Sequence, residues 1–244
     1  MKKQCIAGLL LLSLACTTLY GQWNMGKKVE GNRNVITENR TTTTYDGIKI
    51  SGFFDVDLVA GKEGAITIKG EENILGYITV EVTDNMLKIG TEKGYNLRTS
   101  SGKSVHITVP FESINTLLLS GSGDITSNDV IKADTFDAKL SGSGNLKLTV
   151  DAQKFDMSLS GSGDIVLNGE AADFSSSISG SGDINASNLK SKTVNVSISG
   201  SGDTKVNCSE SLYARVSGSG DIIYYGNPTK KDSKVAGSGE IVKG

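Results

Sequence analysis

Apolar residues recur at every second position through the second half of the chain. Phe136, Ala138 and Leu140 show this alternation, and the segments that end at Leu159 and Ile198 repeat it. A period of two is typical of a β-strand with one buried face. Because the same region shows no helical spacing of apolar residues, the pattern predicts an all-β structure.

A short polar motif separates the predicted strands. Ser-Gly-Ser-Gly-Asp or a close variant recurs, and its acid position falls at Asp124, Asn145, Asp164, Asp183, Asp203, Asp221 and Glu240. Successive copies are 21, 19, 19, 20, 18 and 19 residues apart. A period this regular indicates an array of repeats, each built as strand, turn, strand and second turn.

Strands this short cannot bury a face alone, so each copy must stack on the next. We therefore predict a right-handed parallel β-helix with one coil of ~19 residues per repeat. Coils spaced by about 4.8 Å would form a rod roughly 30–35 Å long. The paired glycines suit a sharp corner, since glycine adopts positive φ without strain. An antiparallel sandwich or a propeller is the alternative, although a propeller blade usually needs about 40 residues.

Residues 45–244 are predicted to form this single domain, with 120–244 as the repeat array and 45–119 as a less regular β region. Ser51-Gly52 lies between alternating apolar residues, like a degenerate first copy of the repeat. Residues 78–89 are predicted to form a hairpin that turns at Asp84-Asn85. We expect this region to cover the first coil, because an open solenoid end exposes apolar strand edges.

The first 21 residues have the organisation of a secretory signal. Two lysines precede an apolar run, Ile6–Ala15, that is too short to span a bilayer. Cleavage after Gly21 is the first interpretation. The alternative is a lipoprotein cut before Cys16, with lipidation of that cysteine as the protein's membrane anchor. Residues 22–44 are polar and are predicted to form a linker or an edge strand.

The composition of the chain limits the functions and the kinds of site that it can have. The 25 basic and 27 acidic residues nearly balance, at a net charge of −2, which gives no electrostatic case for nucleic-acid binding. His106 is the single histidine, so mechanisms and metal sites that need two histidines are excluded. It alternates with apolar residues and is predicted to lie on the surface of a strand. Cys208 is predicted to be a small core residue.

The acid positions are the sharpest candidates for a site. Carboxylates stacked about 5 Å apart repel each other by roughly 0.8 kcal/mol per pair even in water, so something must offset the charge. One explanation is that each carboxylate accepts N–H groups of its own turn. The other is Ca²⁺, which takes oxygen ligands and would be held by Asp124, Asp164, Asp183, Asp203 and Asp221. Asn145 favours the first explanation, because an amide keeps the acceptor and loses the charge. No other cofactor is indicated.

The segments SGFFDVDL at 51–58 and ENILGYITVEV at 72–82, followed by the SGSGDI copies, resemble a known family. It is the family of secreted bacterial proteins called putative auto-transporter adhesin, head GIN domain, and the resemblance covers about residues 40–244. It implies a β-helical fold, an export signal and an adhesin role. The family offers no active site to carry over to this chain.

These observations favour an exported, non-catalytic surface or periplasmic protein that binds a polysaccharide or a protein. Two alternatives stay open. A polysaccharide-active β-helix enzyme would need acids and bases converging in a cleft. A purely structural spacer would have a smooth surface without an apolar or aromatic patch.

Overall fold

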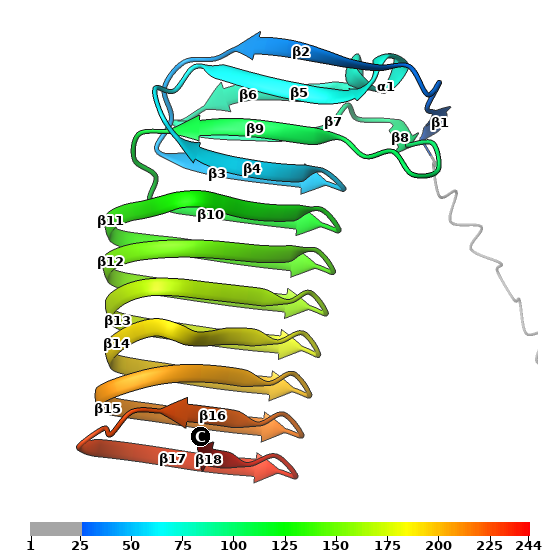
Figure 1. The fold of residues 1–244 in the computed structure, drawn as a ribbon. Helices are drawn as coiled ribbons and strands as arrows, with labels where there is room; N and C mark the ends of the chain where they lie inside the picture. The colour runs from blue at the N-terminus through cyan, green and yellow to red at the C-terminus, as the bar shows by residue number, and fades with distance from the viewer. Residues whose placement is uncertain (1–25) are drawn as a thin grey trace, which may run out of the picture.

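The computed structural model describes residues 26–244, which form a β-solenoid of about seven coils of about 19 residues with a less regular N-terminal part (Figure 1). The predicted fold class is therefore confirmed. The predicted signal peptide and Cys16 lie outside the described residues.

The repeat array consists of long strands that each run from one glycine corner to the next. They are β11 (Asp124–Gly142), β12 (Asn145–Gly161), β13 (Ile165–Gly180), β14 (Ile184–Gly200) and β15 (Thr204–Gly218). Each pairs in parallel with the next, so equivalent residues of successive repeats stack directly on one another. This register excludes the antiparallel sandwich that the strand pattern alone left open.

The alternating apolar residues fill the inside of the coils as stacked columns. Phe136, Phe155 and Phe174 are fully buried, and their ring centroids lie 5.3 and 5.4 Å apart. Tilted rings at this separation add favourable contacts beyond the apolar area that they bury. A second column, of small inward residues, lines the corner opposite the glycines and consists of Ala152, Ala171, Ser191 and Cys208.

The first glycine of each motif is required for two reasons. At Gly161 the backbone has φ +133°, a region that favours glycine. A Cβ added there would also lie only 2.0 Å from the carbonyl oxygen of Gly142 in the preceding coil. The earlier Ser51-Gly52 pairs in register with Ser120-Gly121 and has the same backbone conformation, which confirms it as a degenerate first copy.

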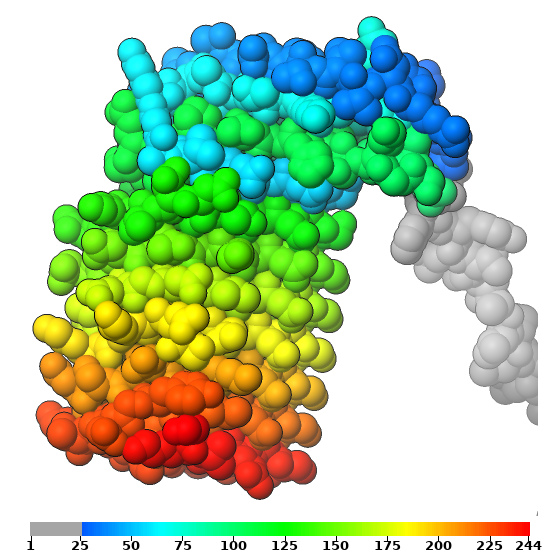
Figure 2. All heavy atoms as spheres, in the orientation of Figure 1, coloured from blue at the N-terminus to red at the C-terminus, as the bar shows by residue number. Residues whose placement is uncertain are grey.

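The N-terminal part covers one end of the solenoid (Figures 1 and 2). The strands β3 (Gly47–Gly52), β4 (Asp55–Ala60), β9 (His106–Phe111) and β10 (Thr116–Gly121) join it to the array. Over them lie β2 (Val35–Thr41), β5 (Ala65–Glu71), the single helical turn α1 (Glu72–Leu75), β6 (Ile78–Thr83) and β7 (Met86–Thr91), with a small separate pair of β1 (Lys27–Glu30) and β8 (Tyr95–Arg98). The predicted hairpin is confirmed as β6–β7, with Asp84 and Asn85 at φ 54° and 57°.

A buried carboxylate ties this region together. Glu71 is fully buried, and its side chain accepts hydrogen bonds from the Arg33 backbone N–H at 2.6 Å and from Ser100 N–H and Oγ at 2.8 and 2.6 Å. Burial disfavours its charge, but these bonds outweigh that effect and hold the pKa of Glu71 below its usual value. The loops after β1 and β8 are thereby held against the end of β5.

We expect Glu71→Gln to lower the free energy of unfolding by about 1–3 kcal/mol at neutral pH, because a buried charged acceptor is lost. Since the folded-state pKa is depressed, this contribution is present above the unfolded pKa and is lost as pH falls through the folded value. Denaturant unfolding of both proteins from pH 7 to pH 3 would show the difference shrinking. The control is Glu81→Gln on the exposed surface of β6; a pH-independent difference at Glu71 would contradict the assignment.

The coil at the other end carries charges at inward positions. It consists of β16 (Ile222–Tyr225), β17 (Lys230–Gly237) and β18 (Ile241–Lys243). Lys231 pairs in register with the buried Leu212, and Lys243 pairs with the buried Tyr224. The Lys231 Nζ lies 3.1 Å from the Tyr224 hydroxyl and 5.3 Å from its ring centroid. Inward-pointing charges protect a sheet edge against pairing with another chain.

Replacing both inward lysines in Lys231→Leu/Lys243→Leu should therefore promote self-association, because the inward side of the last coil would lose its two charges and gain apolar surface. Sedimentation velocity would show a rise in average mass with protein concentration. Lys234→Leu on the outward side of β17 is the matched control and should leave the mass unchanged. An unchanged mass for the double variant would show that the lysines do not guard this edge.

Candidate functional site

The acid column lies along the glycine corner, and its carboxylates bond to the next coil. Asp183 Oδ1 accepts the Asp203 backbone N–H at 2.8 Å, and Asp203 Oδ1 accepts that of Asp221 at 2.8 Å. The first and last copies repeat the contact, from Asn145 N–H to Asp124 Oδ1 at 3.0 Å and from Glu240 N–H to Asp221 Oδ1 at 2.8 Å. The acceptor role is as expected, but the donor is the neighbouring coil, whereas the sequence pointed to N–H groups of the same turn.

The backbone explains this difference. At the corner, the N–H that follows the acid donates to a carbonyl of the next coil, as Ile165 does to Asp183 at 2.8 Å. The N–H of the acid residue points the other way, toward the preceding coil, and there the side-chain oxygen is its acceptor. The carboxylate therefore completes the ladder of bonds between coils. Asn145 serves equally well, since its Oδ1 accepts the Asp164 N–H at 3.0 Å.

Calcium binding by this column stays a prediction. Among residues 26–244, no three or more His, Cys, Asp or Glu side chains are grouped as ligands for a metal ion. The five aspartates lie in one line with Asn145 and Glu240, and a backbone N–H bridges neighbouring positions of this column in five of its six intervals, the exception being Asp164 to Asp183. One carboxylate oxygen per bridging residue is thus already occupied by a donor.

We expect Asp183→Asn to be nearly neutral and Asp183→Ala to cost about 1 kcal/mol, the typical net value of one hydrogen bond. Millimolar calcium should leave the melting temperature unchanged. Asp164→Ala provides a matched control, because among the described residues no N–H of the next coil bonds to the Asp164 carboxylate. A rise in melting temperature with calcium that Asp183→Asn abolishes would replace the hydrogen-bonding account with a metal site.

The two isolated reactive residues lie where the sequence predicted. His106 is on the surface of β9, with its side chain 54% exposed. Cys208 is fully buried, and burial raises the pKa of its thiol. Tyr224 points inward and is buried.

Sequence reasoning missed a contact around His106. Its Nε2 lies 2.7 Å from Ser104 Oγ, and its Nδ1 lies 3.8 Å from Asp55 Oδ2, so a serine, a histidine and an aspartate meet at one place. Ser104 lies two residues before His106, the first residue of β9, but Asp55 comes from the parallel strand β4 and only the fold brings it near. At 3.8 Å the carboxylate is beyond hydrogen-bond range of the ring, and all three side chains lie on an open surface.

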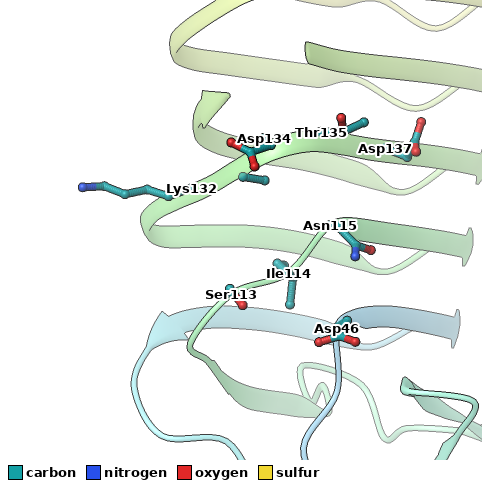
Figure 3. A pocket seen from close by; sticks show the side chains of 9 residues that line it. Asp46, Ser113, Ile114, Asn115, Lys132, Asp134, Thr135 and Asp137 are labelled. Atoms are coloured by element: carbon teal, nitrogen blue, oxygen red, sulfur yellow. The ribbon is translucent and has the colours of Figure 1, made fainter. Parts of the chain in front are cut away.

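Several hollows lie on the outside of the solenoid, and two of them lie beside features described above. The first, of about 530 Å³, lies where the array meets the N-terminal part, and Figure 3 shows Asp46, Asn115, Asp134 and Asp137 around it while Lys132 points away. It exists because β10 begins to pair with β11 only at Asp137. The second, of about 210 Å³, lies on the flat face before the glycine corner, over β12, β13 and β14.

The fold of residues 26–244 places the protein in the class of parallel β-solenoids, in which equivalent residues of successive coils stack in register. The chain belongs to the family described as putative auto-transporter adhesin, head GIN domain, whose sequence profile matches residues 44–228. The resemblance seen in the sequence is thus confirmed. Membership of an adhesin-type family points to an exported or surface protein.

Solved structures agree with this assignment. A crystal structure titled a putative adhesin from Bacteroides fragilis has a TM-score of 0.83 and 28% identity, over 88% of this chain and 99% of that one. A putative lipid binding protein from Parabacteroides distasonis has a TM-score of 0.74 and 26% identity, over 89% and 100%. A putative adhesin from the same organism shares the fold at 22% identity and a TM-score of 0.77, over 89% and 100%.

No protein of curated function is detectably similar to the chain in sequence. In residues 26–244 we find no helix of the length and hydropathy that crossing a bilayer requires.

Proposed function

We propose that the protein is an exported, non-catalytic scaffold of the adhesin type, which binds polysaccharide or protein at a cell surface through the outer faces of its coils. The observation that carries this proposal is the repetition of small polar groups at equivalent outward positions. One column is the stack of Ser120, Ser141, Ser160, Ser179, Ser199 and Ser217. Catalysis needs different groups converging on one reacting atom, whereas one group repeated suits a long, shallow, repetitive ligand.

The relatives support binding at the outside of the coils. Structures of similar fold are titled putative adhesins, and one is titled a putative lipid binding protein. In this chain the interior of the array is filled by stacked apolar side chains, including Phe136 and Phe155. A ligand of any class would therefore contact the outer surface. The nearly balanced charge gives no support for a nucleic-acid partner.

Export is part of the proposal. Residues 1–21 would act as the signal peptide and deliver the protein to the periplasm, the outer membrane surface or the medium. Lipidation of Cys16 is the alternative route, and it would anchor the protein to a membrane.

Beads coated with the purified protein should adhere to intact bacterial or host cells in a saturable way that soluble protein inhibits. Incubation with a polysaccharide panel should release no product, and a fluorophosphonate probe should label no serine. Absence of adhesion together with absence of product would favour the spacer alternative.

The contact of Ser104 with His106 is the observation that favours an enzyme, so a substitution of Ser104 tests the enzyme alternative. Ser104→Ala should leave both adhesion and the background ester hydrolysis unchanged. Labelling of Ser104 by the probe, or hydrolysis that disappears in Ser104→Ala, would overturn the non-catalytic proposal.

A further inference from the structure

We propose that the flat face over β12–β15 contains a binding site for an uncharged polysaccharide, with Tyr213 as the stacking platform. This inference rests on the proposed function and assigns it a place and a ligand class. We call the site the Tyr213 face, defined by Asp156, Ser158, Ser175, Ser177, Asn195, Ser197 and Tyr213.

The hollow in this face arises from a local change in side-chain size. Strand β13 carries serine at two outward positions, Ser175 and Ser177, where the register places Tyr213 and Arg215 two coils further on. Ser176 between them points into the core. The small serines leave about 210 Å³ open between the strands on either side. Two of the hydroxyls within it are hydrogen-bonded to each other, since Ser177 Oγ donates to Ser158 Oγ at 3.2 Å. The hollow is thus lined by groups that can both donate and accept hydrogen bonds.

Tyr213 borders the hollow through its register with Asn195 in the adjacent coil. Its side chain is 42% exposed, and it is the only exposed aromatic residue among residues 26–244. The phenylalanines of the array fill the core, whereas Tyr213 points outward, so packing of the interior does not require its ring. An exposed tyrosine offers a broad apolar ring with a polar tip. Such a ring suits the C–H face of a sugar, while Asn195 and the serines suit its hydroxyls.

Each end of the face carries one ion pair. Lys154 Nζ lies 2.7 Å from Asp156 Oδ2, and Arg215 Nη2 lies 2.6 Å from Asp232 Oδ2. Exposed pairs such as these add little stability. Asp137 and Lys139 of β11 adjoin Asp156 and Ser158 in register, so charges of both signs lie beside the hollow and positive charge is not in excess. The recognition groups that remain are hydroxyls, one amide and one aromatic ring. This balance favours a neutral sugar chain over an acidic one.

The dimensions favour a chain of several sugars that runs along the solenoid axis. Asp156 and Tyr213 are separated by three interstrand steps, or about 14 Å. A ligand of that length would contact one coil after another, so each added sugar would meet a further set of side chains until the face is covered. Affinity should therefore increase with chain length and then level off.

Isothermal titration calorimetry tests this dependence on chain length. The full chain, as exported by its producing cells, is titrated with cello-oligosaccharides and xylo-oligosaccharides of two to six units. We expect binding that strengthens with length, and little binding of oligogalacturonate as the acidic probe. Tyr213→Ala should weaken binding about tenfold, the equivalent of one stacking contact. Tyr213→Phe should keep most of the affinity, because it retains the ring.

Tyr225→Ala is the control, since Tyr225 lies on β16 beyond the glycine corner, and it should bind as the unchanged protein does. Thermal unfolding of each variant separates lost binding from lost folding. Binding that Tyr213→Ala and Tyr225→Ala reduce equally, or tighter binding of the acidic probe, would overturn the site. Absence of binding to both neutral series would overturn it as well. The proposed adhesion would still stand if the coated beads adhere to cells.

Discussion

The close approach of backbones at the Gly-Ser-Gly corner sets the geometry of the whole array. At Gly163, for example, an added Cβ would lie 1.8 Å from the Gly144 carbonyl oxygen, so no larger residue can occupy the position without moving the coil. Parallel strands at about 4.8 Å require the chain to turn the same corner in the same way each time. This contact sets the spacing of the stacked phenylalanines, the acid column and the outward serine columns.

The same constraint creates the roles of the other polar residues. At this corner the N–H of the acid residue has no carbonyl acceptor, and in five of the six intervals of the column the side chain of the preceding acid position accepts it. A stack of identical coils also has two exposed ends, and this protein protects the two ends in different ways. At one end, β2, β5, β6 and β7 cover the last layer, with Glu71 holding the loops beside them. At the other, Lys231 and Lys243 replace the apolar residues of the preceding coil.

Function then lies in the places where the repetition is broken. The uniform serine columns give a flat, polar, neutral face, but a flat face alone selects no ligand. The outward Ser175 and Ser177 open a hollow in it, and Tyr213 adds an aromatic ring at its border. These two departures from the repeat lie on adjacent parts of one face because the coils are in register. An adhesin of this design would hold a polymer by many weak contacts and gain selectivity from a few of them.

Much of this protein followed from the sequence, because a repeat reports the same local geometry many times. The period of two, the spacing of the glycines and the length of the repeat together determined the solenoid, its inward residues and the degenerate copy at Ser51-Gly52. The structure alone decided which groups from different coils meet. The acid side chains bond across coils, Asp55 approaches His106, and Tyr213 borders the hollow over β13. Such contacts depend on the register between segments far apart in the chain, and a pattern that is local in sequence carries no information about that register.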